Sequence, residues 1–269
     1  MKIFIIGFGH MGQAIAQSLR ALPVRGTQTG SKSHYDISAT SRDARLKAAS
    51  SALAVTPDLE CTGLKDADVV ILAVKPQDLA EAAKQYKSNV SANAILVSIA
   101  AGITLAKIEK LFDHKKIVRV MPNIGLSVGE GISAWKSSGL SSDDEKNVRQ
   151  LLNDISENFE ANDEQEIDAV TAISGSGPAY FFVFAAALLK SAKALGLADK
   201  EARALVGKTF SAAAALQKGA DYEDLIKRVA SKGGTTEAAL RVFEKNNLSG
   251  IVEEATKAAY DRSKELNEK

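Results

Sequence analysis

Residues 2–6 read Lys-Ile-Phe-Ile-Ile, residues 7–12 read Gly-Phe-Gly-His-Met-Gly, and residues 13–19 read Gln-Ala-Ile-Ala-Gln-Ser-Leu. The first run is typical of a buried strand, the second is a glycine turn, and the third has the apolar spacing of a helix. Glycines spaced G-x-G-x-x-G between a strand and a helix are typical of dinucleotide-binding turns. The helix N-terminus adds N–H groups and partial positive charge for phosphates. We therefore expect cofactor contacts from Gly7, Phe8, Gly9, His10, Met11 and Gly12.

The composition describes an ordinary globular protein. Its 269 residues are enough for two modest domains with cores of their own. With 34 basic and 33 acidic residues the formal charge is +1, which does not indicate a nucleic-acid or membrane partner. Cys61 is the only cysteine, which excludes an internal disulfide and is typical of a reducing compartment. No secretory signal and no run of about 18 apolar residues is evident, so we expect a soluble, cytoplasmic protein.

Further strands follow the glycine turn. Residues 35–40, 69–74, 94–99 and 116–121 are strand-like and alternate with helix-length segments. This alternation predicts an α/β fold in which an N-terminal Rossmann-type, doubly wound sheet occupies residues 1–162. Residues 131–135 and 157–160 are expected to extend that sheet, with Trp135 as a packing residue. Ligands of such sheets bind beyond the carboxyl ends of the strands. There the chain has Ala73, Val74, Lys75 and Pro76, then Ala100, Ala101 and Gly102, and then Asn123.

The end of the second strand bears on the choice of cofactor. NAD-binding turns usually place a carboxylate there for the ribose 2′-hydroxyl, but this chain has Thr40-Ser41-Arg42. A hydroxyl beside a guanidinium is suited to a 2′-phosphate, because arginine forms charge-assisted bonds to phosphate oxygens. Ser41 and Arg42 therefore favour NADPH over NADH. In the alternative, Arg42 only sits in the first turn of the next helix, residues 43–52, and faces solvent. A long surface loop over residues 23–34 is expected before the second strand.

The second half of the chain is helical. Helical patterns cover residues 166–173, 179–195, 199–216, 222–229, 236–245 and 250–266, with Asp199 and Asp221 as expected N-caps and Gly196 and Gly219 as expected C-caps. We assign residues 163–269 to an all-α dimerisation and substrate domain. The helix over residues 179–195 is apolar on nearly every face, so we expect a partner subunit to cover it in a homodimer. In the alternative it is a core helix of the monomer.

The sequence resembles the pyrroline-5-carboxylate reductases from end to end. The resemblance rests on the glycine turn, Ala73–Pro76, Ala100–Gly102, Met121-Pro122-Asn123, the stretch from Asp168 to Tyr180, and the stretch from Val229 to Leu240, in that order. This sequence differs from the family pattern at two places: it has Lys232 where the family usually has proline, and Ile124-Gly125 where Thr-Pro is usual. The resemblance implies an NAD(P)H-dependent reductase that converts 1-pyrroline-5-carboxylate to L-proline, the final step of proline biosynthesis. It also implies a homodimer that can assemble further, commonly into a decamer.

The chemistry of such a reaction assigns expected roles. A substrate carboxylate needs an anion site, and the Gly-Gly loop before a helix offers N–H groups for it. We expect this site from Ser231, Lys232, Gly233, Gly234 and Thr235, with Ser176 and Gly177 lining the pocket or, alternatively, forming a hinge. The resemblance places Thr236 beside the imine, where its hydroxyl would serve the nitrogen; in the alternative it is an N-cap. Lys75 is expected to line the cofactor rather than transfer a proton, and Asn123 to bond the nicotinamide carboxamide.

The sequence is also compatible with two other functions. One is a Rossmann-type dehydrogenase of the β-hydroxyacid or prephenate type, which would need a Lys or His base that the helical half does not clearly offer. The other is a non-catalytic NADPH-binding regulatory protein. His10, His34 and His114 lie in unrelated contexts, the last two in polar loops, so we expect no metal.

Overall fold

The computed structural model describes residues 1–20, 35–42, 49 and 51–268. The predicted loop over residues 23–34 therefore lies outside the described residues, as does most of the predicted helix over residues 43–52. By packing, the described chain forms two compact units, residues 1–176 with 259–269 and residues 177–258.

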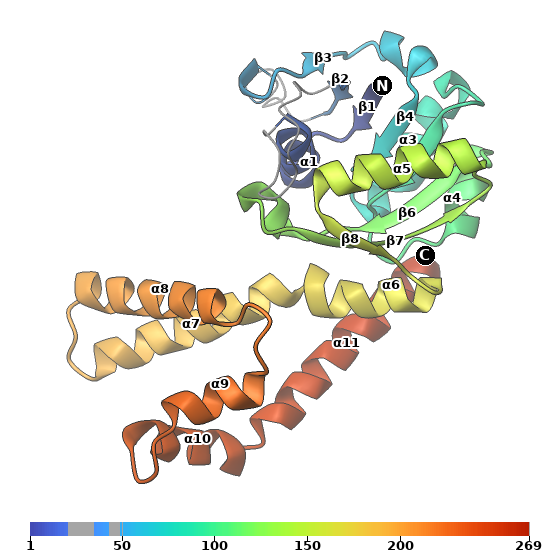
Figure 1. Ribbon diagram of the computed structural model, residues 1–269. Helices are drawn as coiled ribbons and strands as arrows, with labels where there is room; N and C mark the ends of the chain where they lie inside the picture. Colours follow the sequence, from blue (N-terminus) through green and yellow to red (C-terminus); the bar gives the residue numbers. More distant parts are fainter. Residues whose placement is uncertain (21–34, 43–48, 50, 269) are drawn as a thin grey trace. The chain divides into compact units, whose positions relative to one another are not determined.

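One eight-stranded sheet is the centre of the first unit (Figure 1). Strands β1 to β6 run parallel, β7 pairs antiparallel with β6, and β8 pairs parallel with β7. The order is β3-β2-β1-β4-β5-β6-β7-β8, so the direction of strand addition reverses between β1 and β4. The strands are β1 (Lys2–Ile6), β2 (Asp36–Thr40), β3 (Thr56–Pro57), β4 (Val69–Leu72), β5 (Ile95–Ser98), β6 (Ile117–Met121), β7 (Ile132–Ser138) and β8 (Glu157–Glu160). The predicted Rossmann-type, doubly wound sheet and its extension by the last two strands are confirmed.

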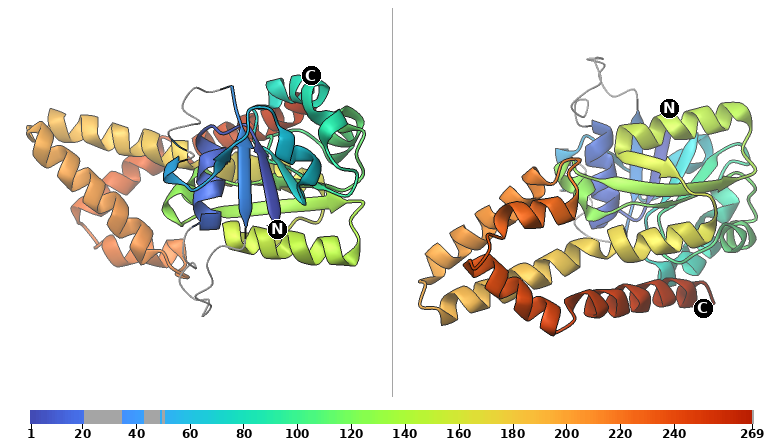
Figure 2. Two further views of the ribbon diagram at one scale, coloured as in Figure 1. Left: turned by 90° about the horizontal axis from the view of Figure 1, so that it is seen from above. Right: turned by 60° about the horizontal axis from the view of Figure 1, so that its bottom comes forward.

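Helices lie on both sides of the sheet (Figure 2). Helices α1 (His10–Arg20) and α5 (Ser142–Ile155) contribute to one apolar core, and α3 (Leu79–Tyr86) and α4 (Leu105–Phe112) contribute to the other. The strands between these cores are apolar on both faces, as the burial of all four residues of β4 shows. Trp135 is 1% exposed and belongs to the first core, which confirms its packing role.

A buried ion pair fastens α6 (Glu164–Val170) to the sheet. Arg119 of β6 is 2% exposed, and its Nη1 and Nη2 lie 3.0 and 2.5 Å from carboxylate oxygens of Glu164 and Asp168. The Ser263 hydroxyl, near the C-terminal end of α11 (Leu248–Glu268), also donates to Asp168 at 2.9 Å. The carboxyl end of α11 thus lies in the sheet unit, and Asn267 accepts a hydrogen bond from Thr104 at 2.9 Å.

The second unit consists of helices. It contains α7 (Gly177–Ala194), α8 (Asp199–Leu216), α9 (Tyr222–Val229), α10 (Thr235–Lys245) and the first part of α11. Gly196 and Gly219 have positive φ after α7 and α8, and the Asp221 carboxylate caps α9, as predicted. The expected N-cap at Asp199 is wrong: Ala198 is the N-cap, and the Asp199 carboxylate binds Arg203 and Lys193 instead.

Large apolar side chains of α7 remain exposed in the single chain. Phe181, Phe182 and Val183 are 63, 62 and 70% exposed. By length and composition alone, the helical stretch Glu164–Ala194 is apolar enough to cross a bilayer, and such a stretch is weak evidence for a membrane span. Exposure of this kind is also expected of a helix that a second subunit covers.

The change from strands to helices falls near residue 162, where the sequence predicts the domain boundary. Packing divides the chain elsewhere, at residues 176/177 and 258/259. The physical reason is that α6 contacts β6 and β7, while the end of α11 contacts the segment after β5.

Candidate cofactor and substrate sites

The glycine turn has the geometry that its spacing predicts. Gly7 has φ +96°, and a Cβ there would lie 2.7 Å from the Ala73 carbonyl oxygen. A Cβ on Gly12 would lie 2.4 Å from the Gly7 carbonyl oxygen. A Cβ on Gly9 would meet nothing within 4 Å. Gly7 and Gly12 are therefore required by the chain itself, whereas the space at Gly9 is open to a ligand.

Three strand ends meet at this turn. The Gly7 N–H donates to the Thr40 carbonyl at 2.9 Å, and the Ala73 N–H donates to the Ile6 carbonyl at 2.8 Å. The carboxyl ends of β1, β2 and β4 are thus held together at the point where the strand order reverses, which is where open α/β sheets bind ligands. The first turn of α1 adds N–H groups that have no helical acceptor. This arrangement fits a dinucleotide pyrophosphate.

Two expected cofactor residues differ in what they offer. Phe8 is fully buried in the core, and its carbonyl accepts a hydrogen bond from the Gln13 side chain at 2.9 Å, so its side chain is not available to a ligand. Arg42 lies at the end of β2 with its side chain 76% exposed, and its guanidinium is 3.3 Å from Asp78. Because exposed ion pairs of this kind contribute little stability, Arg42 is available to a stronger anion such as phosphate.

The segment after β5 is constrained by packing. Ala100 is 4% exposed, and a Cβ on Gly102 would lie 2.3 Å from the Ser263 carbonyl oxygen. The Cβ side of Gly102 is therefore closed by α11 and is not open to a ligand.

Asn123 follows β6 and is engaged within the chain. Its Nδ2 donates to the Ser174 hydroxyl at 3.0 Å, and its Oδ1 accepts from the Gly125 N–H at 3.1 Å. Ser174 lies in a π-helical turn, Thr171–Gly175, a feature often found at functional sites. Gly125 is required locally, because a Cβ there would lie 2.4 Å from the Glu130 carbonyl oxygen. The sequence therefore brings Asn123 and Ser174 together at the carboxyl edge of the sheet.

The Gly-Gly loop of the helical unit forms a tight turn. The Gly234 N–H donates to the Ser231 carbonyl at 2.9 Å, and Gly233 has φ +74°. Lys232 has a negative φ and Gly233 a positive one. This combination defines a type II turn with Lys232 at its second position and Gly233 at its third. Helix α10 begins directly afterwards, at Thr235.

The start of α10 offers free donors. Its N-cap is Gly234 without a side-chain cap, so the alternative role of Thr236 as N-cap is wrong. Within the described residues, no acceptor outside the helix is found for the Thr235 and Thr236 N–H groups, and helical geometry provides none in the first turn. Glu237 binds the Gly233 N–H at 2.5 Å and Arg241 at 2.9 Å. The hydrogen bond from the Gly233 N–H, and to a smaller extent the contact with Arg241, lower the pKa of the Glu237 carboxyl.

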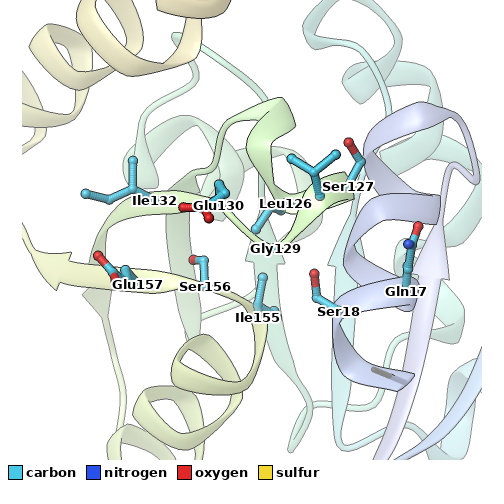
Figure 3. Close-up of a pocket in the computed structure, with 12 residues that line it drawn as sticks. Gln17, Ser18, Leu126, Ser127, Gly129, Glu130, Ile132, Ile155, Ser156 and Glu157 are labelled. Atoms are coloured by element: carbon cyan, nitrogen blue, oxygen red, sulfur yellow. The ribbon is translucent and has the colours of Figure 1, made fainter. Parts of the chain in front are cut away.

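A separate cavity of about 440 Å³ lies between α1, the loop before β7 and the start of β8 (Figure 3). None of the predicted site residues lines it. The carboxylates of two lining residues, Glu130 and Glu157, would repel a pyrophosphate. The lining residues are Gln17, Ser18, Leu126, Ser127, Val128, Gly129, Glu130, Gly131, Ile132, Ile155, Ser156 and Glu157.

The histidines do not form a site in the described part of the chain. His114 lies in the loop between α4 and β6, as predicted, but it is only 6% exposed, and its Nε2 lies 2.7 Å from the Ala94 carbonyl oxygen. Its ring instead holds the start of β5, because the buried carbonyl needs a donor. Among the described residues, no three His, Cys, Asp or Glu side chains gather as metal ligands.

The chain matches two known protein families and is similar over its whole length to characterised relatives. The family described as "Pyrroline-5-carboxylate reductase dimerisation" matches residues 164–266, and "NADP oxidoreductase coenzyme F420-dependent" matches residues 2–102. The pyrroline-5-carboxylate reductase of Pseudomonas aeruginosa is 35% identical over 99% of this chain and 97% of its own length. That of Arabidopsis thaliana is 34% identical over 99% of this chain and 96% of its own length.

Solved structures show the same architecture. The pyrroline-5-carboxylate reductase of Coxiella burnetii has a TM-score of 0.81 and 32% identity, and covers 98% of this chain and 97% of its own. The pyrroline carboxylate reductase of Plasmodium falciparum, solved with NADP bound, has a TM-score of 0.83 and 26% identity, and the match covers 99% of this chain and 98% of its own. Prephenate dehydrogenase of Aquifex aeolicus, 18% identical with a TM-score of 0.52, shares the fold alone.

Fold and site together define a Rossmann-type oxidoreductase with a helical dimerisation domain. Within that class, the chain belongs to the pyrroline-5-carboxylate reductase family.

Proposed function

We propose that this protein reduces 1-pyrroline-5-carboxylate to L-proline with NADPH as the preferred reductant and NADH as a second cofactor. The observation that carries the proposal is the pairing, in one chain of this family, of an open glycine turn at Gly9 with free N–H donors at the start of α10. The first suits a pyrophosphate and the second suits a carboxylate. The exposed guanidinium of Arg42 supports NADPH, as does the NADP bound by the Plasmodium falciparum relative.

The division of labour follows from the chemistry. Residues 1–162 form the cofactor domain and residues 163–269 the dimerisation and substrate domain. When bound, the cofactor supplies a hydride from nicotinamide C4. The chain binds the pyrophosphate at the glycine turn, with the backbones of Ala73–Pro76 and Ala100-Ala101 lining the cofactor and Asn123 at the nicotinamide amide. The Thr235 and Thr236 N–H groups, held directly after the type II turn at Ser231–Gly234, bind the substrate carboxylate, and Ser176 and Gly177 remain expected substrate contacts.

Thr236 serves the imine nitrogen. Its hydroxyl is partly exposed at the second position of α10, where it can donate to the nitrogen and exchange its proton with water. An unperturbed hydroxyl is a poor acid at neutral pH, so the main contribution of the protein is to hold an iminium and the hydride donor together.

We propose that the protein is a cytoplasmic homodimer that assembles further to a decamer; the exposed apolar face of α7 supports the dimer. Burying Phe181, Phe182 and Val183 against a second subunit would remove apolar surface from water, which is the main driving force for stable association.

The direct experiment measures NADPH oxidation on addition of racemic pyrroline-5-carboxylate, with β-hydroxyacids and a blank as controls. The proposal expects rapid oxidation with the cyclic imine and formation of L-proline. Activity confined to the hydroxyacid arm would favour a dehydrogenase acting on alcohols. NADPH binding without turnover in any arm would favour a regulatory protein.

A further inference from the structure

The turn at Ser231–Gly234 lacks the residue that would make it rigid. A type II turn favours proline at its second position, because the ring fixes φ near the value that the turn needs. This chain has Lys232 there, with a negative φ and an exposed side chain. The turn therefore keeps the right backbone shape without a covalent restraint on it.

Glu237 provides a restraint of another kind. Its carboxylate reaches back over one helical turn and accepts the Gly233 N–H at 2.5 Å, at the residue whose φ is +74°. The other carboxylate oxygen accepts from Arg241, one turn further along α10, at 2.9 Å. The Gly234 N–H is already used by the Ser231 carbonyl. The turn is thus fixed at both glycines, and the N–H groups of Thr235 and Thr236 are left for a ligand.

We infer that Glu237 is a positioning residue that orders the Ser231–Gly234 turn, so that the donors at the start of α10 are held ready for the substrate carboxylate. The inference rests on the proposed function for the identity of that carboxylate. Glu237 itself does not bind the substrate: its negative charge would repel it. In this chain the Glu237–Gly233 contact does the work that proline at position 232 would do by fixing φ.

The test is a rescue experiment with Glu237→Ala, Lys232→Pro and the double variant. Losing the contact leaves the turn to be ordered by the substrate, and ordering one residue costs about 1–2 kcal/mol, or roughly a 5- to 30-fold rise in KM. We expect Glu237→Ala to raise KM for pyrroline-5-carboxylate by about that factor, with kcat and KM for NADPH much less affected. Adding Lys232→Pro should restore most of the loss, because proline fixes φ without the carboxylate.

A matched control and a readout independent of activity complete the design. The control is Asp199→Ala. Like Glu237, Asp199 lies in the first turn of a helix of the same unit and pairs with an arginine four positions later, Arg203. Because Asp199 is far in sequence from the Ser231–Gly234 turn, the KM of this variant for pyrroline-5-carboxylate should stay near the wild-type value. Hydrogen exchange of the Gly233 amide should accelerate by about tenfold or more in Glu237→Ala, since a bond to a charged group is lost. This readout tests the restraint even if the wild-type protein does not turn over the cyclic imine.

Four results would overturn the inference. A lower KM in Glu237→Ala would mean that Glu237 competes with the substrate for the Gly233 N–H. Equal losses in Asp199→Ala would mean a general effect on the helices. Unchanged Gly233 exchange, or no rescue by Lys232→Pro, would remove Glu237 from the ordering of the turn.

Discussion

Nη2 of Arg119 lies 2.5 Å from Oδ1 of Asp168, 49 residues away in the sequence, and both side chains are almost completely buried. The pair joins the last parallel strand to α6, just before the π-helical turn that holds Ser174. It therefore fixes where the chain leaves the sheet, and with it the position of Asn123 and Ser174.

Removing one partner of this pair should be costly. Asp168→Ala leaves a buried guanidinium with Glu164 alone, so we expect the free energy of unfolding to fall by about 3 kcal/mol. The measurement is urea unfolding at fixed protein concentration. Glu145→Ala, which breaks an exposed pair with Arg149 on α5, should cost less than about 1 kcal/mol. A similar cost for both would mean that burial adds nothing at Arg119.

The glycine turn allows folding and binding to be separated. Gly9→Ala should leave the melting temperature nearly unchanged, because its Cβ meets nothing within 4 Å. The same methyl group would occupy the space where the pyrophosphate approaches, so NADPH affinity, measured by fluorescence titration, should fall at least about tenfold.

The control for this variant is Gly12→Ala, whose Cβ would lie 2.4 Å from a backbone oxygen. It should lower the melting temperature as well as NADPH affinity, because the helix must move away from the strand. Unchanged NADPH affinity in Gly9→Ala would place the pyrophosphate elsewhere.

Arg42 should discriminate between the two nicotinamide cofactors. A charge-assisted bond to a 2′-phosphate contributes about 1.5–3 kcal/mol, so Arg42→Ala should raise KM for NADPH about 10- to 100-fold and change KM for NADH little. Asp78→Asn, which frees Arg42 from its ion pair, should leave NADPH binding intact or improve it. Equal losses for both cofactors in Arg42→Ala would contradict the phosphate assignment.

Thr236→Ala tests the proton-handling role. Because Gly234 rather than Thr236 is the N-cap, the substitution removes no cap and should change stability by less than about 0.5 kcal/mol. Turnover of pyrroline-5-carboxylate should fall by about 10- to 100-fold while the NADPH dissociation constant stays the same. Near-wild-type turnover would remove the hydroxyl from the mechanism.

The α7 face tests the homodimer. Val183 is 70% exposed in the single chain. Val183→Lys places a charge there, and burying that charge against a partner subunit would be unfavourable. Light scattering should show a larger fraction of monomer at equal concentration. Lys84→Glu on α3, 78% exposed in the sheet unit, is the control and should not change the mass. An unchanged mass for Val183→Lys would leave that face outside the interface.

Prediction from the sequence was most successful where a pattern is local. The strand-to-helix glycine turn, the alternation of strands with helices and the six C-terminal helices follow from spacing over a few residues. It failed for the N-cap expected at Asp199 and for the alternative N-cap role of Thr236, because a cap depends on where the first turn begins, which a shift of one residue changes. The contact between Glu237 and the Gly233 N–H was missed, although the two residues are only four positions apart. The direction of that N–H depends on the turn type, which the spacing of residues does not specify.

The sequence by itself determined the two-part organisation of this protein and the geometry of its glycine turn, since both are encoded in short-range periodicity and in residues with special backbone freedom. Only the tertiary structure decided that Gly102 is closed by Ser263, that the ring of His114 is buried against the Ala94 carbonyl before β5, and that Arg119 is neutralised by α6. Those features arise where segments far apart in the chain pack together, and no local pattern specifies which distant atom will fill a given space.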